Sequence, residues 1–156
     1  MAERHDIPVV VKGGSTTMWT LTVTKPSPHT IVLALAGDAG RRWDARSGDV
    51  FDALMNLRRK LEPVGVQLCC NGARRNAWSS GMQRDMGGGY ATYLLELGEH
   101  RTRPKHVRTL DPAPPSEVVT VAEQLAFQEQ WRAERSDWAR WSLRLEAWLK
   151  NRQPTP

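Results

Sequence analysis

The sequence predicts an α+β fold in a single domain, and three observations lead to this prediction. Short apolar segments with the two-residue period of β-strands fill much of residues 1–98. One amphipathic helix is expected among them at about residues 48–62, and a long tryptophan-rich helix follows at about residues 121–152. With 156 residues, the chain is long enough for one domain with its own hydrophobic core.

Three strands are predicted before the first helix. Residues 7–14 form an apolar run that ends at two glycines, and residues 18–25 alternate large apolar side chains with threonines. Residues 30–37 are apolar at both alternating positions, which is typical of a strand covered on both faces. We therefore expect the third strand in the middle of a mixed sheet of four to five strands.

The first helix is predicted from the spacing of Val50, Leu54, Leu57 and Leu61, which places these side chains on one helical face. Asp49 is suited to the N-terminus of this helix, where a carboxylate interacts favourably with the helix dipole. A proline and a glycine end the helix shortly after its last leucine.

The strand after this helix, residues 66–70, is predicted to lie parallel to residues 30–36 in a right-handed β-α-β unit. Parallel strands have their C-terminal ends at the same edge of a sheet, so the arginine-containing loops that follow the two strands would meet there. Convergence of these loops would form an anion site from Arg41, Arg42, Arg74 and Arg75.

Residues 71–89 form a loop between the strand at 66–70 and a last strand at 90–97. Hairpin loops usually contain two to about five residues, so a loop of this length in a compact domain is often functional. Glycines allow a backbone to approach a ligand, and arginines donate charge-assisted hydrogen bonds to phosphate or carboxylate. In addition to Arg74 and Arg75, the candidate anion- or partner-binding residues in this loop are Ser80, Arg84, Gly87 and Gly88.

An alternative, purely structural interpretation of the loop is that Ser79 or Ser80 caps a short helical turn that continues through Met86 and ends at Gly87. The glycine run precedes a strand instead of opening a helix, which does not fit a nucleotide-binding fingerprint.

No catalytic residue, metal ligand or cofactor is predicted. The histidines are scattered, and Cys69 and Cys70 are neighbours on one predicted strand, where an ordinary disulfide between them is geometrically poor. No serine or cysteine has a base at a recognised motif position. The alternative is a catalytic site assembled from distant loop carboxylates such as Asp38 and Asp85.

The C-terminal part of the chain divides into two segments. Residues 99–119 are basic and then proline-rich, so we expect a solvated strap or a flexible linker. Residues 120–156 contain a helix and a tail, and Thr120 and Glu123 form a capping box at the start of the helix. The candidate partner-binding residues share one helical stripe and are Trp131, Trp138, Trp141 and Trp148.

A straight helix of this length would extend beyond a domain with a radius of gyration of about 15 Å. Two alternatives follow for the apolar stripe. The helix could break between Ser136 and Asp137 and fold back onto the sheet, or a second chain could cover the stripe.

The composition limits the partners and the compartment. The 22 lysines and arginines exceed the 17 acidic residues, giving a net charge of +5, and arginine dominates the basic side chains. This bias suits an anionic partner, although the coding bias of a bacterial GC-rich genome is the favoured explanation. No segment approaches the ~20 apolar residues of a membrane span and no signal peptide is visible, so we expect a cytoplasmic protein without membrane contact.

Taken together, these features predict a non-enzymatic binding protein, in the style of an adaptor or an immunity protein. It would recognise another macromolecule through the arginine- and glycine-rich loops and the tryptophan-rich helix, either a protein partner or a second copy of itself. The alternative is a phosphate-directed protein that uses the same arginines to bind nucleic acid or nucleotides, enzymes included.

Overall fold

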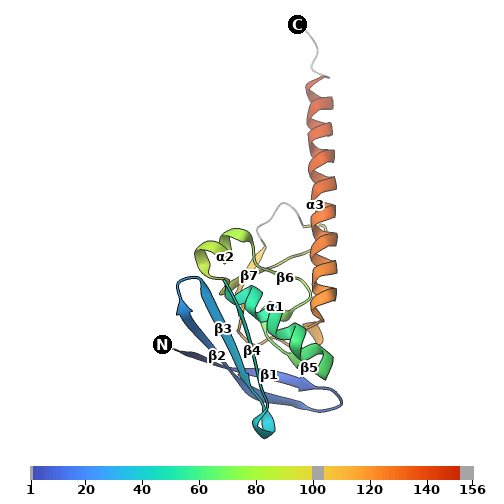
Figure 1. Cartoon of the computed structure of the whole chain (residues 1–156). Coiled ribbons are helices and arrows are strands. Elements are labelled where there is room, and N and C mark those ends of the chain that lie inside the picture. Colours follow the sequence, from blue (N-terminus) through green and yellow to red (C-terminus); the bar gives the residue numbers. More distant parts are fainter. Residues whose placement is uncertain (1, 100–103, 152–156) are drawn as a thin grey trace.

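The computed structural model describes residues 2–99 and 104–151, and it has the predicted α+β fold with a long C-terminal helix (Figure 1). The five strands of the main sheet are β1 (Glu3–Val11), β2 (Thr16–Ser27), β3 (Thr30–Ala36), β4 (Arg42–Ser47) and β5 (Val66–Leu68). A small second sheet contains β6 (Ala77–Trp78), β7 (Ala91–Leu94) and β8 (Lys105–Arg108). The helices are α1 (Val50–Leu61), α2 (Gly81–Gly87) and α3 (Val121–Lys150).

The prediction of a mixed sheet with a parallel β-α-β pair is wrong. The strand order is β4-β3-β2-β1-β5, and every pairing in this sheet is antiparallel. The segment that the sequence analysis treated as an arginine-glycine loop contains strand β4, which reverses the chain direction before helix α1 begins. Strand β5 therefore runs opposite to β3, and α1 connects β4 and β5 at the two edges of the sheet.

The middle position of the sheet belongs to β2, so the prediction for residues 30–37 is also wrong. Burial in β3 alternates: Ile31, Leu33 and Leu35 are buried, whereas Val32 is half-buried and Ala34 is exposed. The outward-facing positions are apolar but small, which explains why the sequence resembles a strand covered on both faces.

Helix α1 covers the inner face of the sheet and forms the core with it. Its predicted span is confirmed, and Asp49 is the N-cap, with its side chain accepting a hydrogen bond from the Asp52 backbone at 2.9 Å. Leu54 and Leu57 pack in one buried cluster with side chains of the strands such as Leu21 and Leu33. The core is thus a two-layer arrangement of one helix on one antiparallel sheet.

Residues 105–119 lie along the body, whereas residues 100–103 fall outside the described part of the chain. After β8, isolated bridges pair Cys70 with Pro112 and Arg74 with Val118. The predicted capping box is confirmed, since the Thr120 and Glu123 side chains each accept a hydrogen bond from the other residue's backbone. Within the described ranges, no helix is long and apolar enough to span a bilayer.

Helix α3 is continuous over 30 residues, so the predicted alternative of a break between Ser136 and Asp137 is wrong. At about 1.5 Å per residue the helix is about 45 Å long, and it projects well beyond the body (Figure 1). Its buried residues are confined to the first turns, at Val121, Gln124 and Gln128. Further along the helix, the Glu134 side chain accepts a hydrogen bond from the Gly98 backbone at 2.7 Å, so the body also contacts the middle of α3.

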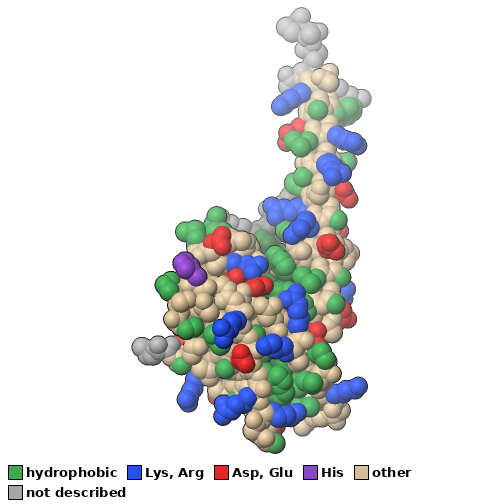
Figure 2. All heavy atoms as spheres, viewed as in Figure 1, with side chains coloured by type: hydrophobic (Ala, Val, Ile, Leu, Met, Phe, Trp, Pro, Cys, Tyr) green, Lys and Arg blue, Asp and Glu red, His purple; other side chains and the backbone are tan. Residues whose placement is uncertain are grey.

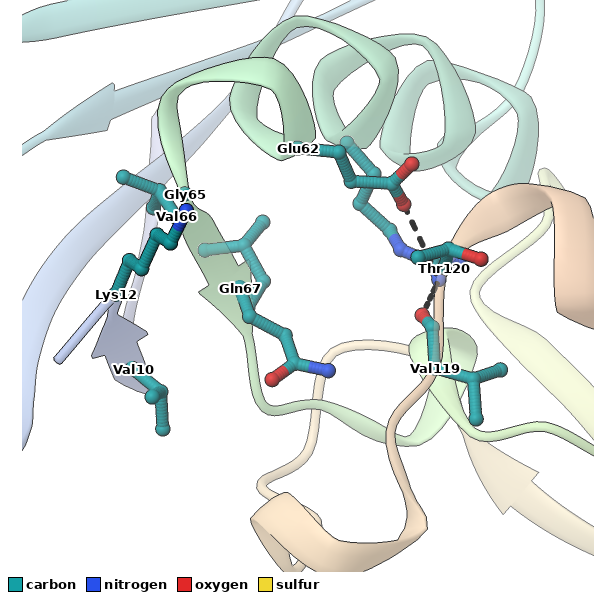
Figure 3. A pocket seen from close by; sticks show the side chains of 10 residues that line it. Val10, Lys12, Glu62, Gly65, Val66, Gln67, Val119 and Thr120 are labelled. Carbon is teal, nitrogen blue, oxygen red and sulfur yellow. Dashed lines mark hydrogen bonds and ion pairs between the residues drawn. The ribbon is translucent and has the colours of Figure 1, made fainter.

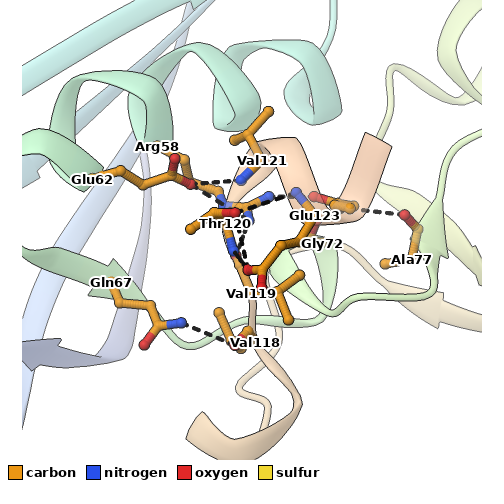
Figure 4. Close-up of polar contacts among 11 residues, drawn as sticks. Arg58, Glu62, Gln67, Gly72, Ala77, Val118, Val119, Thr120, Val121 and Glu123 are labelled. Atoms are coloured by element: carbon orange, nitrogen blue, oxygen red, sulfur yellow. Dashed lines mark hydrogen bonds and ion pairs between the residues drawn. The ribbon is translucent and has the colours of Figure 1, made fainter. Parts of the chain in front are cut away.

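A buried polar network fixes the root of α3 to α1 (Figure 4). Arg58 is only 3% exposed, and its guanidinium donates to the Gln124 side chain and to the Val119 carbonyl. The Gln124 amide nitrogen in turn donates to the carbonyls of Gly72 at 2.9 Å and Ala77 at 2.8 Å. Burial lowers the pKa of Arg58, so these acceptors are needed to offset the cost of placing a cation in the interior.

Replacing Arg58 with alanine should destabilise the fold by about 2–4 kcal/mol, because Gln124 and Val119 would lose a buried donor. Urea unfolding monitored by circular dichroism would measure this loss. The matched control is Arg59→Ala, which removes an exposed arginine from the next position of the same helix and should cost less than about 0.5 kcal/mol. Equal midpoints for the two variants would contradict a structural role for the network.

Candidate functional site

The first predicted pair, Arg41 and Arg42, lies at the turn between β3 and β4. The Arg41 guanidinium stacks over the rings of Trp19 and Trp43, at 5.2 Å and 5.7 Å from their centroids. These two rings stack on each other at 5.6 Å, and a Cβ at Gly37 would come within 2.9 Å of the Trp19 ring. Arg41 thus covers an aromatic pair at the end of the core by a cation–π contact.

The second predicted pair, Arg74 and Arg75, attaches the C-terminal part of the chain to the body. Arg74 forms a salt bridge with Glu117 and donates to the Asn71 side chain at 3.2 Å. The Arg75 guanidinium lies 5.6 Å from the ring centroid of Phe127 on α3. Both side chains therefore have intramolecular contacts that sequence spacing alone did not indicate.

The predicted convergence of the four arginines is wrong. Strands β3 and β5 run in opposite directions, so the segments that follow them leave from opposite ends of the sheet. The sheet topology therefore excludes a common anion site built from both pairs. The additional strand β4 reverses the chain before α1, so β5 runs opposite to β3.

The loop at residues 71–89 contains helix α2, as the structural interpretation of this segment predicted. Ser80 is the N-cap and forms a reciprocal capping box with Gln83, while Gly88 ends the helix in the left-handed conformation, one residue later than predicted. Arg84 pairs with Asp49 at 2.9 Å and with Asp52 at 3.4 Å. This double ion pair fastens α2 to the first turn of α1.

The glycine run, Gly87 to Gly89, packs the end of α2 against the N-terminus of α1. The Val50 backbone donates to the Gly88 carbonyl at 2.8 Å, and Thr109 donates to the Gly89 carbonyl at 2.7 Å. Gly89 has φ +72°, and a Cβ there would lie 2.7 Å from both Asp49 Oδ1 and the Phe51 nitrogen. Gly89 thus permits a close approach within the chain and Gly88 supplies the positive φ that ends α2, whereas Gly87 is exposed beside them.

A polar cavity of about 370 Å³ adjoins this junction and contains two of the predicted site residues, Arg84 and Gly88. Lys25 and His29 lie on its wall, together with the carboxylates of Asp49 and Asp85. Because Arg84 is already paired with Asp49, the wall carries no clear surplus of positive charge for an anion. The cavity therefore does not replace the anion site that the sequence predicted.

A second cavity, of about 290 Å³, lies between β5 and the root of α3 (Figure 3). Polar side chains of the cavity wall bind the backbone at the start of α3. Glu62 accepts a hydrogen bond from the Val121 backbone at 2.7 Å, and Gln67 donates one to the Val118 carbonyl at 2.9 Å. Sequence analysis did not single out these residues, because each contact joins positions far apart in the chain. The arrangement supports α3 structurally.

The buried cysteines offer no nucleophile at neutral pH. Burial raises the pKa of the Cys70 thiol to about 11 and also raises the pKa of Cys69, so both carry their proton. In the part of the chain that the structure describes, no three His, Cys, Asp or Glu residues are grouped in a way that could hold a metal ion.

The four predicted tryptophans of α3 differ in their surroundings. Trp131 and Trp138 are half-buried near the body, and Arg135 lies 5.2 Å from the ring centroid of Trp131. Trp141 is 58% exposed and Trp148 is 49% exposed, on the part of the helix that extends beyond the body. The stripe that packs at the root thus continues into solvent.

We define the distal stripe as Trp141, Leu145 and Trp148, which share one face of the projecting helix. Trp138 lies at its base, beside an open depression lined by Gly98, Glu134, Asp137 and Trp141. Figure 2 shows hydrophobic side chains along this projection, interspersed with basic and acidic ones. The distal stripe is the candidate functional site, since exposed apolar residues of this size and grouping are typical of interaction surfaces.

Comparison with known proteins assigns no family. No protein-family model matches the chain, and no curated protein matches it.

Replacing Gly89 with alanine should destabilise the fold by about 2 kcal/mol or more, because the added Cβ meets the N-terminus of α1 at a positive φ. The matched control is Gly81→Ala at the first position of α2, where the added Cβ meets nothing within 4 Å and should be neutral or stabilise by up to about 1 kcal/mol. Chemical unfolding measures both. An unchanged free energy of unfolding in the Gly89→Ala variant would refute the structural role of the glycine run.

Deleting residues 139–156 should change the melting temperature by less than about 2 °C, because α3 has no buried residue after Gln128. Differential scanning calorimetry measures the effect, and circular dichroism should show a loss of helical signal alone. A large drop in melting temperature would mean that the distal part of α3 contributes to the core.

Proposed function

We propose that this protein is a non-enzymatic binding protein that docks onto a protein partner through the distal stripe of α3. The observation that carries the proposal is the continuation of the apolar stripe past the body, with Trp141, Leu145 and Trp148 between 39% and 58% exposed. Soluble monomers seldom leave a contiguous apolar surface of this kind in water, so a second molecule is the expected cover.

The spacing of the stripe supports a helix-in-groove mode of binding. Trp141, Leu145 and Trp148 occupy positions i, i+4 and i+7, which are the anchor positions of amphipathic helices that bind in apolar grooves. A tryptophan buries about 150–250 Å² and is enriched among residues that dominate binding energy. The partner should therefore present a hydrophobic groove lined by pockets for two indole rings.

The charges of the projecting segment favour a protein partner over nucleic acid. Asp137 and Glu146 alternate with Arg140, Arg144 and Lys150, so the segment is not a uniformly basic surface. Phosphate backbones select dense basic patches with steep salt dependence, whereas a stripe dominated by indole and leucine side chains depends mainly on apolar burial. A protein groove with mixed charges at its rim fits this distribution.

The root of α3 supports this role because it orders the binding segment before a partner binds. Arg58 and Gln124 fix the first turns of the helix through buried hydrogen bonds, and the helix is continuous from there to the stripe. A binding element that is already ordered loses less conformational entropy on association. The body thus serves as a rigid base that presents the helix.

The arginine- and glycine-rich loops lend little support to the prediction that they bind the partner together with the tryptophan-rich helix. Arg41, Arg74 and Arg75 have contacts within the chain, and the two pairs lie at opposite ends of the sheet. We therefore assign the binding role to α3 and treat nucleic acid as the competing outcome of the experiment.

The test is affinity purification of the tagged full-length chain from its native host, comparing wild type with a Trp141→Ser/Leu145→Ser variant. Recovery of a co-purifying protein should fall at least about tenfold in the variant, because truncating interface tryptophans commonly costs about 2 kcal/mol or more. The matched control is Leu143→Ser, which removes an exposed leucine from another face of the same helix and should retain the partner.

Binding to the wild-type chain should persist in moderate salt, because apolar burial is only weakly screened. Recovery of nucleic acid that dissociates as salt rises would favour the phosphate-directed alternative instead. Equal recovery of the same protein with all three chains would place the interface elsewhere.

A further inference from the structure

The outer face of the five-stranded sheet, opposite α1, has a distinctive distribution of charge. Its two inner strands, β2 and β3, contribute small neutral side chains to the middle of this face, at Thr20, Thr22, Thr24, Val32, Ala34 and Ala36. The exposed Met18 of β2 lies on the same face, two residues before Thr20. The flanking strands β1 and β4 carry charged side chains on the same face. A neutral centre with charges at two opposite borders resembles the anatomy of a protein interface.

The charged borders are in register across the sheet. One row of paired neighbours across the four strands consists of Arg4, Thr22, Ala34 and Asp44. The adjacent row consists of Asp6, Thr20, Ala36 and Arg42. The first row therefore runs from positive on β1 to negative on β4, and the second row runs from negative to positive.

This alternation makes the face complementary to itself. A two-fold axis parallel to the strands, between β2 and β3, places β1 of one copy over β4 of the other in the same row. Arg4 then faces Asp44 of the other copy, and Asp6 faces Arg42 of the other copy. Each of these opposite-charge pairs occurs twice, because the symmetry generates both.

The centre of the face suits such packing. With strands about 4.8 Å apart, β1 and β4 are about 14 Å apart, which is wide enough for two sheets to pack about 10 Å from each other. Thr22 of one copy would lie against Ala34 of the other, and Thr20 against Ala36, so a threonine side chain meets a small neighbour at each position. Ala34 is exposed in the monomer, so the described part of the chain leaves it uncovered.

We propose that the outer face of the main sheet is a dimer interface for a second copy of this chain, with the two sheets packed face to face around this two-fold axis. The surface is separate from the distal stripe, since it belongs to β1–β4 and α3 projects from its root beside β5 and α1 (Figure 1). A dimer formed in this way carries two projecting helices and would engage a partner bivalently.

The test is analytical ultracentrifugation of the full-length chain across a concentration series, with charge reversals at one pair. Wild type should reach a dimer as concentration rises. Arg42→Asp or Asp6→Arg alone should weaken dimerisation at least about tenfold, because each creates two like-charge contacts. The combined Asp6→Arg/Arg42→Asp chain should return to the wild-type dimer affinity, because the exchange restores opposite charges.

Two control variants separate this interface from self-association elsewhere on the chain. Arg46→Asp changes an exposed charge on the same face of β4, outside the two complementary rows, and should leave the dimer unchanged. The full-length Trp141→Ser/Leu145→Ser chain should also remain dimeric, which excludes α3 as the contact. If Asp6 variants fold poorly, owing to the loss of its 3.1 Å hydrogen bond from Thr20, the exchange Arg4→Asp/Asp44→Arg provides the same comparison.

A wild-type chain that stays monomeric at every concentration would overturn the proposal. So would a dimer that is indifferent to the single reversals, or a double exchange as weak as either single change. Loss of the dimer in the Trp141→Ser/Leu145→Ser chain would move self-association to α3 and leave the proposed partner-binding role of that helix to be judged by its own experiment.

Discussion

The buried guanidinium of Arg58 is the constraint on which the arrangement of the molecule depends. A cation in the interior must have its donors satisfied, and Arg58 achieves this with Gln124 and the Val119 carbonyl. Gln124 extends the network to the carbonyls of Gly72 and Ala77. One set of hydrogen bonds therefore fixes both α3 and the segment between β5 and α2. The direction in which α3 leaves the body follows from this anchoring.

The second constraint is the direction of the chain in the sheet. Strand β4 reverses the chain before α1, and this places the segments after β3 and β5 at opposite ends of the sheet. The arginines that follow these strands consequently have separate roles, in an aromatic stack at one end and in fastening α3 at the other. A motif that resembles a ligand loop in sequence, such as the glycine run, similarly serves close packing against the N-terminus of α1.

Two exposed surfaces of the molecule remain to be considered. The distal stripe lies on the projecting part of the continuous helix α3, and the outer face of the sheet lies opposite α1, which covers the inner face. Their chemistries differ. The stripe offers large indole rings for an apolar groove, whereas the sheet face offers small side chains bordered by charges whose order is complementary under two-fold symmetry.

The sequence by itself determined the features that depend on contacts within a few residues. The capping box at Thr120, the N-cap at Asp49 and the amphipathic face of α1 involve neighbours three or four positions apart, so their residue types and spacing suffice to predict them. The tryptophan stripe of α3 could be identified for the same reason, and with it the candidate site.

Only the tertiary structure decided which strands pair and which charges meet. These contacts join segments that are far apart in the chain. They include the pairing of β1 with β5, the Arg58–Gln124 contact and the row that aligns Asp6 with Arg42. Such contacts depend on the competition among all strands for partners, and no local pattern records its outcome. The fold class and the tryptophan stripe therefore followed from the sequence, whereas the strand directions and the charge pattern on the outer face of the sheet did not.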